Sequence, residues 1–150
     1  MCDKHAFAFD VDRAYGDQLI DAIENSPRHS LEKPEAPKAI GVYALYRGDD
    51  PLPVYVGKVD SVAGVNGRLA DHKRKIKNRQ NIDLSEVTCR YLTMAQKWEV
   101  ARAEDVLIKY YNSPWNKITG FGMHVPGAGR PGRPGYANQW NILFPPKRSS

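Results

Sequence analysis

The sequence predicts an α+β fold: a small three-stranded antiparallel sheet flanked by helices, with an N-terminal helical extension and a Gly/Pro-rich basic C-terminal tail. Two runs of β-branched and aromatic residues, 40–46 and 54–59, are separated by a polar turn segment and predict a β-hairpin. A third run, 87–93, alternates as a strand does, and apolar residues recur at helical spacing elsewhere in the chain. With 150 residues the chain has the length of one domain, which we expect to span residues 1–150.

The N-terminal extension is expected to cover residues 1–38. Apolar side chains at helical spacing predict a helix over residues 15–24, and the Asn-Ser-Pro sequence that ends at Pro27 stops it. Residues 28–38 are polar and rich in proline. This composition predicts an extended connector that lies on the surface.

The core of the domain is expected to cover residues 39–117. After the hairpin, residues 67–77 predict a basic helix with Asn66 as its N-cap. After the third strand, residues 95–111 predict a long helix that ends before Pro114.

Glu104 is the most informative residue of the long helix. It lies within an apolar stripe that would face the core, where a carboxylate costs several kcal/mol unless a cation or hydrogen-bond donors meet it. Two kinds of partner are open: a buried salt bridge, for instance to Arg102 or Arg68, or a bound metal ion. The stripe consists of Val100, Ala101, Leu107, Ile108 and Tyr111.

The C-terminal tail, residues 118–150, differs from the rest in composition. From Lys117 onward the chain has six glycines and five prolines in 34 residues, and its one short apolar group lies near residues 140–144. This composition predicts a segment that builds no core of its own. The tail either contacts a partner through its basic residues or is a disordered basic segment.

Charge is distributed unevenly, although the net charge is only +5. Residues 1–38 carry a net charge of −3, whereas residues 67–79 carry +5 and residues 106–150 carry +6. A single basic run is often only a solvated surface, but two such segments predict a polyanionic partner such as DNA. We expect the DNA contacts to come from Lys73, Arg74, Lys75, Lys77, Arg79, His124, Arg130 and Arg133.

The composition argues against several other classes of protein. No apolar run is long enough to cross a bilayer, and the first residues lack the apolar core of a signal peptide, so we expect a cytoplasmic protein with no membrane partner. Cys2 and Cys89 are too few for a disulfide framework or a zinc cluster.

Four further residues could carry chemistry as a group. Arg68 and His72 are four residues apart on one face of the basic helix, where they could bind a phosphate and exchange a proton. Tyr43 and Tyr55 lie on the two strands of the hairpin, where tyrosines are also common packing residues. Each residue is ordinary in isolation, and only the combination carries a functional signal.

Two tripeptides on the hairpin resemble the two-part signature of the GIY-YIG nucleases. They are Gly41-Val42-Tyr43 and Tyr55-Val56-Gly57, with valine in place of isoleucine in both halves. The order of residues downstream is also similar: an arginine, a histidine four residues later, a glutamate on a following helix and an asparagine beyond it. These positions are Arg68, His72, Glu104 and Asn116, and the resemblance spans residues 39–117.

A looser resemblance extends to one branch of that family. Residues 29–31 and residues 120–130 of the tail are similar to the GIY-YIG type II restriction enzymes that cut a GC-only palindrome. This resemblance implies a sequence-specific endonuclease that cuts double-stranded DNA. It also implies a homodimer, because two active sites must reach the two strands of a palindromic site.

The resemblance further implies roles for individual residues. Glu104 would bind one Mg²⁺, or Mn²⁺ in its place, and Arg68 would bind a phosphate oxygen. Tyr43 would take the proton from the attacking water, although an unperturbed phenol has a pKa of about 10. Lys58, Tyr55 and His72 would therefore have to stabilise the phenolate or relay its proton, and Asn116 would orient the site. The implied catalytic set is Tyr43, Tyr55, Lys58, Arg68, His72, Glu104 and Asn116.

Two other functions fit the same residues less fully. One is a structure-directed GIY-YIG nickase of repair or mobile elements, which usually carries an additional DNA-binding domain that we do not expect in these 150 residues. The other is a catalytically silent DNA-binding module, and the full set of candidate catalytic residues argues against it.

Overall fold

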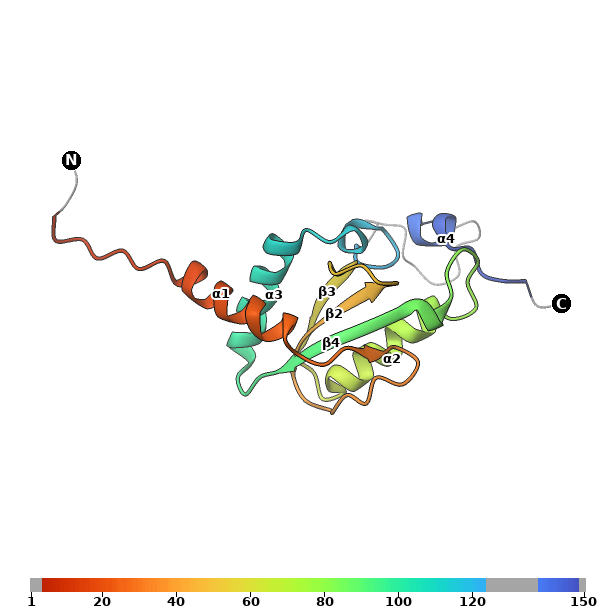
Figure 1. The fold of residues 1–150 in the computed structure, drawn as a ribbon, viewed down its shortest axis with the longest axis horizontal. Helices are drawn as coiled ribbons and strands as arrows, with labels where there is room; N and C mark the ends of the chain where they lie inside the picture. The colour runs from red at the N-terminus through yellow and green to blue at the C-terminus, as the bar shows by residue number, and fades with distance from the viewer. Residues whose placement is uncertain (1–3, 124–137, 149–150) are drawn as a thin grey trace.

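The fold is built on a four-stranded antiparallel sheet with helices on both faces (Figure 1). The computed structural model describes residues 4–123 and 138–148. None of the helices within these ranges has the length and apolar character that a membrane span requires. The elements are α1 (Val11–Glu24), β1 (His29–Ser30), β2 (Gly41–Arg47), β3 (Tyr55–Val59), α2 (Gly64–Ile76), β4 (Val87–Thr93), α3 (Lys97–Tyr111) and α4 (Gln139–Leu143), with 3-10 turns at Leu84–Glu86 and Pro114–Lys117.

The strand order β1-β4-β2-β3 places β2 inside the sheet and β3 at an edge. Because successive side chains of a strand point to opposite faces, β2 contributes to two cores. Tyr43 and Leu45 pack against the face that carries α2, whereas Val42, Ala44 and Tyr46 pack against α1 and α3. All five side chains are fully buried. The predicted α+β class is thus confirmed, with one strand more than the sequence predicted.

Residues 28–38 are not the surface connector that their composition predicts. His29 and Ser30 form β1, which pairs antiparallel with β4 and supplies the fourth strand. Leu31 is fully buried and Ala36 is 8% exposed, so this segment also covers part of the core. A strand of two residues is too short to leave an alternating pattern in a sequence, which explains why it was not predicted.

Both α1 and α2 begin earlier than the sequence predicts, whereas α3 begins two residues later. α1 begins earlier because Asp10 caps it, with Oδ1 accepting a hydrogen bond from the backbone N–H of Arg13 at 3.0 Å. Asn66 is not the N-cap of α2, because the helix already begins at Gly64, which has a positive φ of 65°. The Asn66 side chain donates instead to the carbonyl oxygen of Ala36 at 3.0 Å.

The buried face of α3 is rotated slightly from the predicted stripe. Val100, Ala103 and Leu107 are fully buried, whereas Ala101 and Ile108 are exposed. Each residue turns a helix by about 100°, so a residue one position away from the buried face points away from the core.

The tail supplies part of the existing core, although it builds no core of its own. Phe121, Trp140 and Phe144 are buried and pack with Trp115, with ring centroids between 4.4 and 6.0 Å apart. The indole N–H of Trp140 donates to the Lys75 carbonyl oxygen of α2 at 3.2 Å. These few aromatic side chains suffice because they complete an existing core and do not have to build a separate one.

We predict that Trp140→Ala lowers the free energy of unfolding by about 3–5 kcal/mol, because it leaves a cavity where an almost fully buried indole lay. Urea unfolding measures the change. Trp98→Ala is the matched control, since Trp98 is 70% exposed and its loss should change stability by less than about 0.5 kcal/mol. Equal unfolding midpoints for the two variants would show that the tail does not belong to the core.

Candidate active site

Tyr43 and Tyr55 come together because their strands pair antiparallel. The register places Tyr43 opposite Gly57 and Tyr55 opposite Leu45, and both phenol rings pack on the face that carries α2. Their ring centroids are 6.0 Å apart. A Cβ atom on Gly57 would lie only 2.6 Å from the Tyr43 hydroxyl oxygen. The glycine of the second tripeptide is therefore required by the close approach of the Tyr43 ring.

The helix α2 brings His72 to the same place. The Tyr43 hydroxyl and His72 Nε2 are hydrogen-bonded at 2.6 Å, and both side chains are buried. The His72 ring also packs against Tyr55 and Phe121, each with a centroid distance of 4.9 Å. Arg68 lies one helical turn before His72 and is close enough to the Tyr43 hydroxyl to lower its pKa.

The surroundings of this pair keep both groups neutral. Burial, and to a smaller extent the cations Lys75 and Arg68, together lower the pKa of His72 to about 3. Neutral Nε2 can therefore accept the hydrogen bond that the Tyr43 hydroxyl donates. Burial, and then the neighbouring Tyr55, raise the pKa of Tyr43 well above its usual value, and Arg68 offsets this only in part.

A pocket of about 340 Å³ opens beside the tyrosines. Tyr55 and Arg68 form the wall nearest the Tyr43–His72 pair, and Glu104 reaches the pocket from α3. Tyr43 itself lies behind this wall, because its side chain is fully buried. The lining residues are Tyr55, Lys58, Val59, Asp60, Ser61, Ala63, Arg68, Asp71 and Glu104.

Glu104 is half-buried and has no ion-pair partner within 4.0 Å in the described part of the chain. The salt bridge to Arg102 that the sequence left open does not form, because Arg102 pairs with Asp12 of α1 at 2.6 Å. Burial raises the pKa of the Glu104 carboxyl group, and the nearby cations Lys58 and Arg68 act in the opposite direction. The carboxyl group therefore lines the pocket without an ion-pair partner among the described residues.

This donor set fits a hard divalent cation that is held partly by its substrate. Residues 4–123 and 138–148 contain no cluster of three or more His, Cys, Asp or Glu side chains that could enclose a metal ion. Mg²⁺, however, is commonly bound by one or two carboxylates together with water and substrate phosphates. The Glu104 carboxyl group, which has no ion pair in the described residues, matches that mode of binding.

Asn116 holds the edge strand that carries Tyr55. Its side-chain oxygen accepts from the Val56 N–H at 2.9 Å, and its side-chain nitrogen donates to the Val56 carbonyl oxygen at 2.8 Å. The neighbouring Trp115 N–H donates to the Val54 carbonyl oxygen at 2.8 Å. Asn116 thus fixes the backbone of Val56, between Tyr55 and Gly57. Asn116 itself does not line the pocket.

The basic side chains of α2 and of the turn after it differ in their contacts within the protein. Lys73 donates to the Glu32 carbonyl oxygen at 2.7 Å, and Arg74 pairs with Asp71. The Lys75 ammonium lies over the Phe121 ring at 5.6 Å. Arg79 donates to Asn141 and to the Phe144 carbonyl oxygen, so it also fastens α4. The remaining predicted DNA contacts are Lys77, which directly follows α2, and His124, Arg130 and Arg133, which lie outside the described residues.

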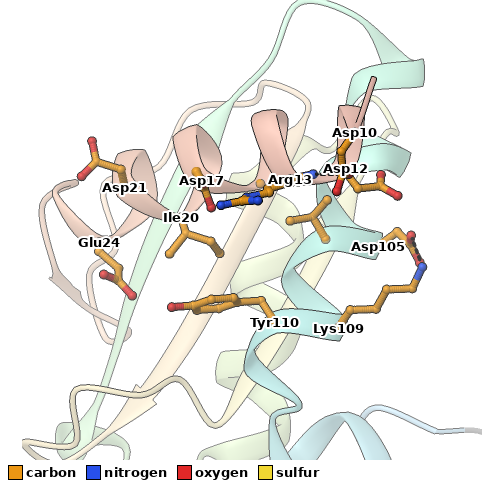
Figure 2. A pocket seen from close by; sticks show the side chains of 12 residues that line it. Asp10, Asp12, Arg13, Asp17, Ile20, Asp21, Glu24, Asp105, Lys109 and Tyr110 are labelled. Atoms are coloured by element: carbon orange, nitrogen blue, oxygen red, sulfur yellow. Dashed lines mark hydrogen bonds and ion pairs between the residues drawn. The ribbon is translucent and has the colours of Figure 1, made fainter. Parts of the chain in front are cut away.

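A larger cavity, of about 670 Å³, lies between α1 and α3 on the other face of the sheet (Figure 2). Figure 2 shows the carboxyl groups of Asp17, Asp21 and Glu24 on α1 and of Asp105 on α3 around it. Six carboxyl groups and only two cations line this cavity, which we call the acidic groove, so it would repel a DNA phosphate. The smaller pocket at Glu104 is therefore the candidate active site.

Phe121 is the residue of this site that the sequence did not reveal. Its ring is 7% exposed and contacts both His72 and Tyr55. The one signal in the sequence is an aromatic residue inside the Gly-Phe-Gly stretch of the tail, and apolar residues in such a stretch carry no periodicity that would place them.

Comparison with known protein families identifies a family that matches most of the chain. The model of the family described as the Eco29kI GIY-YIG domain matches residues 36–149 of the chain. This range includes every candidate catalytic residue. None of the curated proteins compared with the chain matches it.

We predict that His72 makes the protein less stable in acid. Its pKa of about 3 in the folded state lies below the usual 6.5, so the unfolded chain binds a proton first as the pH falls. The contribution of His72 to the free energy of unfolding should therefore decrease as the pH falls below about 6.5, and it should level off near the pKa of His72 in the folded state. Urea unfolding at about pH 7 and about pH 4.5 should show roughly 2–3 kcal/mol more loss for the wild type than for His72→Gln. Equal losses would contradict the buried neutral histidine.

Proposed function

The chain belongs to the Eco29kI GIY-YIG domain family of nucleases, and we propose that it is a type II restriction-like endonuclease that cuts double-stranded DNA at a specific sequence with one divalent metal ion. The observation that carries this proposal is the placement of an unpaired Glu104 carboxyl group in a pocket whose wall covers the hydrogen-bonded Tyr43–His72 pair. Within the single unit of residues 1–150, residues 39–117 would be the catalytic core, and the tail would contact DNA.

We propose that the proton of the attacking water leaves through the tyrosines. Tyr55 lines the pocket and its hydroxyl is close enough to that of Tyr43 for each to affect the pKa of the other. A water proton passes toward Tyr43 by way of Tyr55 while the Tyr43 proton passes to His72 Nε2. Both phenols have raised pKa values, so a concerted relay avoids an isolated phenolate.

Arg68 and Lys58 are the cations of the pocket. As oxygen attacks phosphorus and the bond to the 3′ oxygen breaks, negative charge builds up on the phosphate oxygens. The planar guanidinium of Arg68 can bind two of these oxygens, and Lys58 adds a point charge on the same wall. Arg68 therefore links phosphate binding to the Tyr43 hydroxyl, with which it also interacts.

Glu104 would hold the metal ion, Mg²⁺ or Mn²⁺, against the scissile phosphate. When bound, such an ion withdraws charge from a phosphate oxygen and helps the leaving oxygen to depart. Glu104 itself contributes a carboxyl group whose other neighbours, Lys58 and Arg68, are cationic and suited to phosphate.

The partner would be double-stranded DNA, bound by a homodimer at a palindromic site. Two copies of the pocket are needed because one pocket can cut only one strand at a time. The acidic groove between α1 and α3 would face away from the DNA, and the basic α2 would face it.

We predict that Tyr43→Phe and Glu104→Ala each abolish cleavage while the protein remains folded. The first removes the hydroxyl that passes the proton, and loss of general acid–base catalysis typically costs about 10²–10⁴-fold in rate. The second removes the carboxyl group that would hold the metal. Digestion of plasmid DNA in Mg²⁺ or in EDTA, with circular dichroism as the test of folding, measures both effects.

Two matched variants control for the substitutions themselves. Tyr110→Phe removes the hydroxyl of a tyrosine that is 62% exposed on α3, and Asp105→Ala removes a carboxyl group from the residue next to Glu104. Both should cut as the wild type does. Full cleavage by Glu104→Ala in Mg²⁺, or cleavage by the wild type that is as fast in EDTA as in Mg²⁺, would exclude the metal site at Glu104.

We predict that Arg130→Ala and Arg133→Ala together reduce the preference for the target sequence, because arginine side chains recognise guanine edges and phosphates. Deleting residues 118–150 is a poor test, since it would also remove the buried Phe121 and Trp140. Sequencing the ends produced from a DNA library reports preference and cleavage together. An unchanged set of cut sites in the double variant would exclude readout by these arginines.

A further inference from the structure

Phe121 joins the tail to the candidate active site. Its ring lies 4.9 Å from the His72 ring at an interplanar angle of 32°, and it meets the Tyr55 ring edge to face at 5.1 Å. Because the tail packs here, the His72 ring lies among three aromatic rings, those of Tyr43, Tyr55 and Phe121. A residue 49 positions after His72 in the chain thus forms one side of its environment.

His72 needs such contacts because one of its two nitrogens lacks a hydrogen-bond partner. Nε2 is hydrogen-bonded to Tyr43, whereas Nδ1 is buried and finds no partner among the described residues. In many catalytic histidines a hydrogen bond at the second nitrogen fixes the orientation of the ring and its protonation. Here ring packing is the interaction that can hold the imidazole in place.

The position of Phe121 is itself well fixed. Its ring contacts Trp140 at 4.4 Å and Trp115 at 5.1 Å. The backbone on either side is tightly packed: Gly120 has a φ of 87°, and a Cβ on Gly122 would lie 2.4 Å from the Trp115 carbonyl oxygen. The two glycines around Phe121 therefore allow the chain to turn closely enough for the ring to reach His72.

We propose that Phe121 is a positioning residue, which holds the His72 imidazole against the Tyr43 hydroxyl and keeps water away from it. The C-terminal segment is then part of the proton-transfer machinery as well as of the core. This inference rests on the proposed function, in which His72 accepts the Tyr43 proton.

The charged and titratable groups that face His72 agree with this role. They are Tyr43 from β2, Tyr55 from β3, and Arg68 and Lys75 from α2 itself. None of them is a carboxylate that could stabilise a protonated imidazole. Exclusion of water is thus the main cause of the low pKa of His72, and removal of the Phe121 ring should raise that pKa toward its usual value.

The test compares Phe121→Leu with Phe144→Leu. Phe144 is buried to the same extent, 7% exposed, and contacts the same Trp115 and Trp140 rings. No ring contact between Phe144 and His72 occurs in the described part of the chain, so this variant reports general loss of tail packing. If Phe121→Leu does not fold, Phe121→Met takes its place, because methionine fills irregular space without a planar ring.

Two readouts are needed. NMR of ¹⁵N-labelled histidine, without DNA or metal, should show the His72 pKa rising by at least about 1 unit toward 6.5 in Phe121→Leu and staying at its wild-type value in Phe144→Leu. The cleavage rate of Phe121→Leu relative to Phe144→Leu should fall as the pH decreases, by up to about tenfold at one pH unit below the usual histidine pKa. A positioning role changes this pH profile, whereas a purely structural role lowers both variants equally at every pH.

The outcomes separate this inference from the proposed function. The same His72 pKa in the two variants overturns the positioning role, whether or not the protein cuts DNA. If the His72 pKa shifts in Phe121→Leu but the wild type does not cut DNA, the packing role of Phe121 is supported. The nuclease proposal is then excluded, and so is the catalytic part of this inference. A shifted pKa with the same pH profile in both variants shows that His72 does not carry the proton.

Discussion

The buried hydrogen bond between the Tyr43 hydroxyl and His72 Nε2 is the interaction on which the rest of the site depends. It forms only if β2 and β3 pair in the observed register, if residue 57 has no side chain, and if α2 presents His72 to the same face of the sheet. Asn116 adds to this by fixing β3, which has no strand on its outer side. Correct placement of this hydrogen bond therefore depends on β3, which carries the second tripeptide, and on α2 together. A shift of either element would move the Tyr43 hydroxyl away from His72 Nε2.

The same architecture separates two surfaces of opposite charge. The central β2 is buried on both faces, so the helices on each side can present different side chains to solvent. On one side, α1 and α3 form an acidic groove, and on the other, α2 carries the basic run. Glu104 lies at the boundary: it is on α3, yet its carboxyl group reaches the pocket formed with β3 and α2. This placement explains how one carboxyl group can approach a polyanion while its neighbour Asp105 lines the acidic groove.

Local patterns in the sequence predicted the parts of this fold that have a local cause. The strand at residues 87–93 has the predicted bounds, and the hairpin places both tyrosines as expected, because alternation and β-branched residues mark strands over several positions. Glu104 was recognised as exceptional because a carboxyl group interrupts an apolar helix face. No comparable signal in the sequence marks β1, the close approach of the Tyr43 ring to Gly57, or the contact of Phe121 with His72. Each of these depends on a contact between distant residues, and the composition of the tail does not show which of its aromatic residues join the core.

The central claim is that the Glu104 carboxyl group holds a divalent cation in the pocket that the Tyr43–His72 pair serves. Anomalous scattering from Mn²⁺, in crystals grown with a DNA duplex that the protein binds without cutting it, tests this directly. We expect a single anomalous peak in contact with Glu104 and a phosphate oxygen, in the pocket that Tyr55 and Arg68 line. A peak among the carboxyl groups between α1 and α3, with none at Glu104, would contradict it.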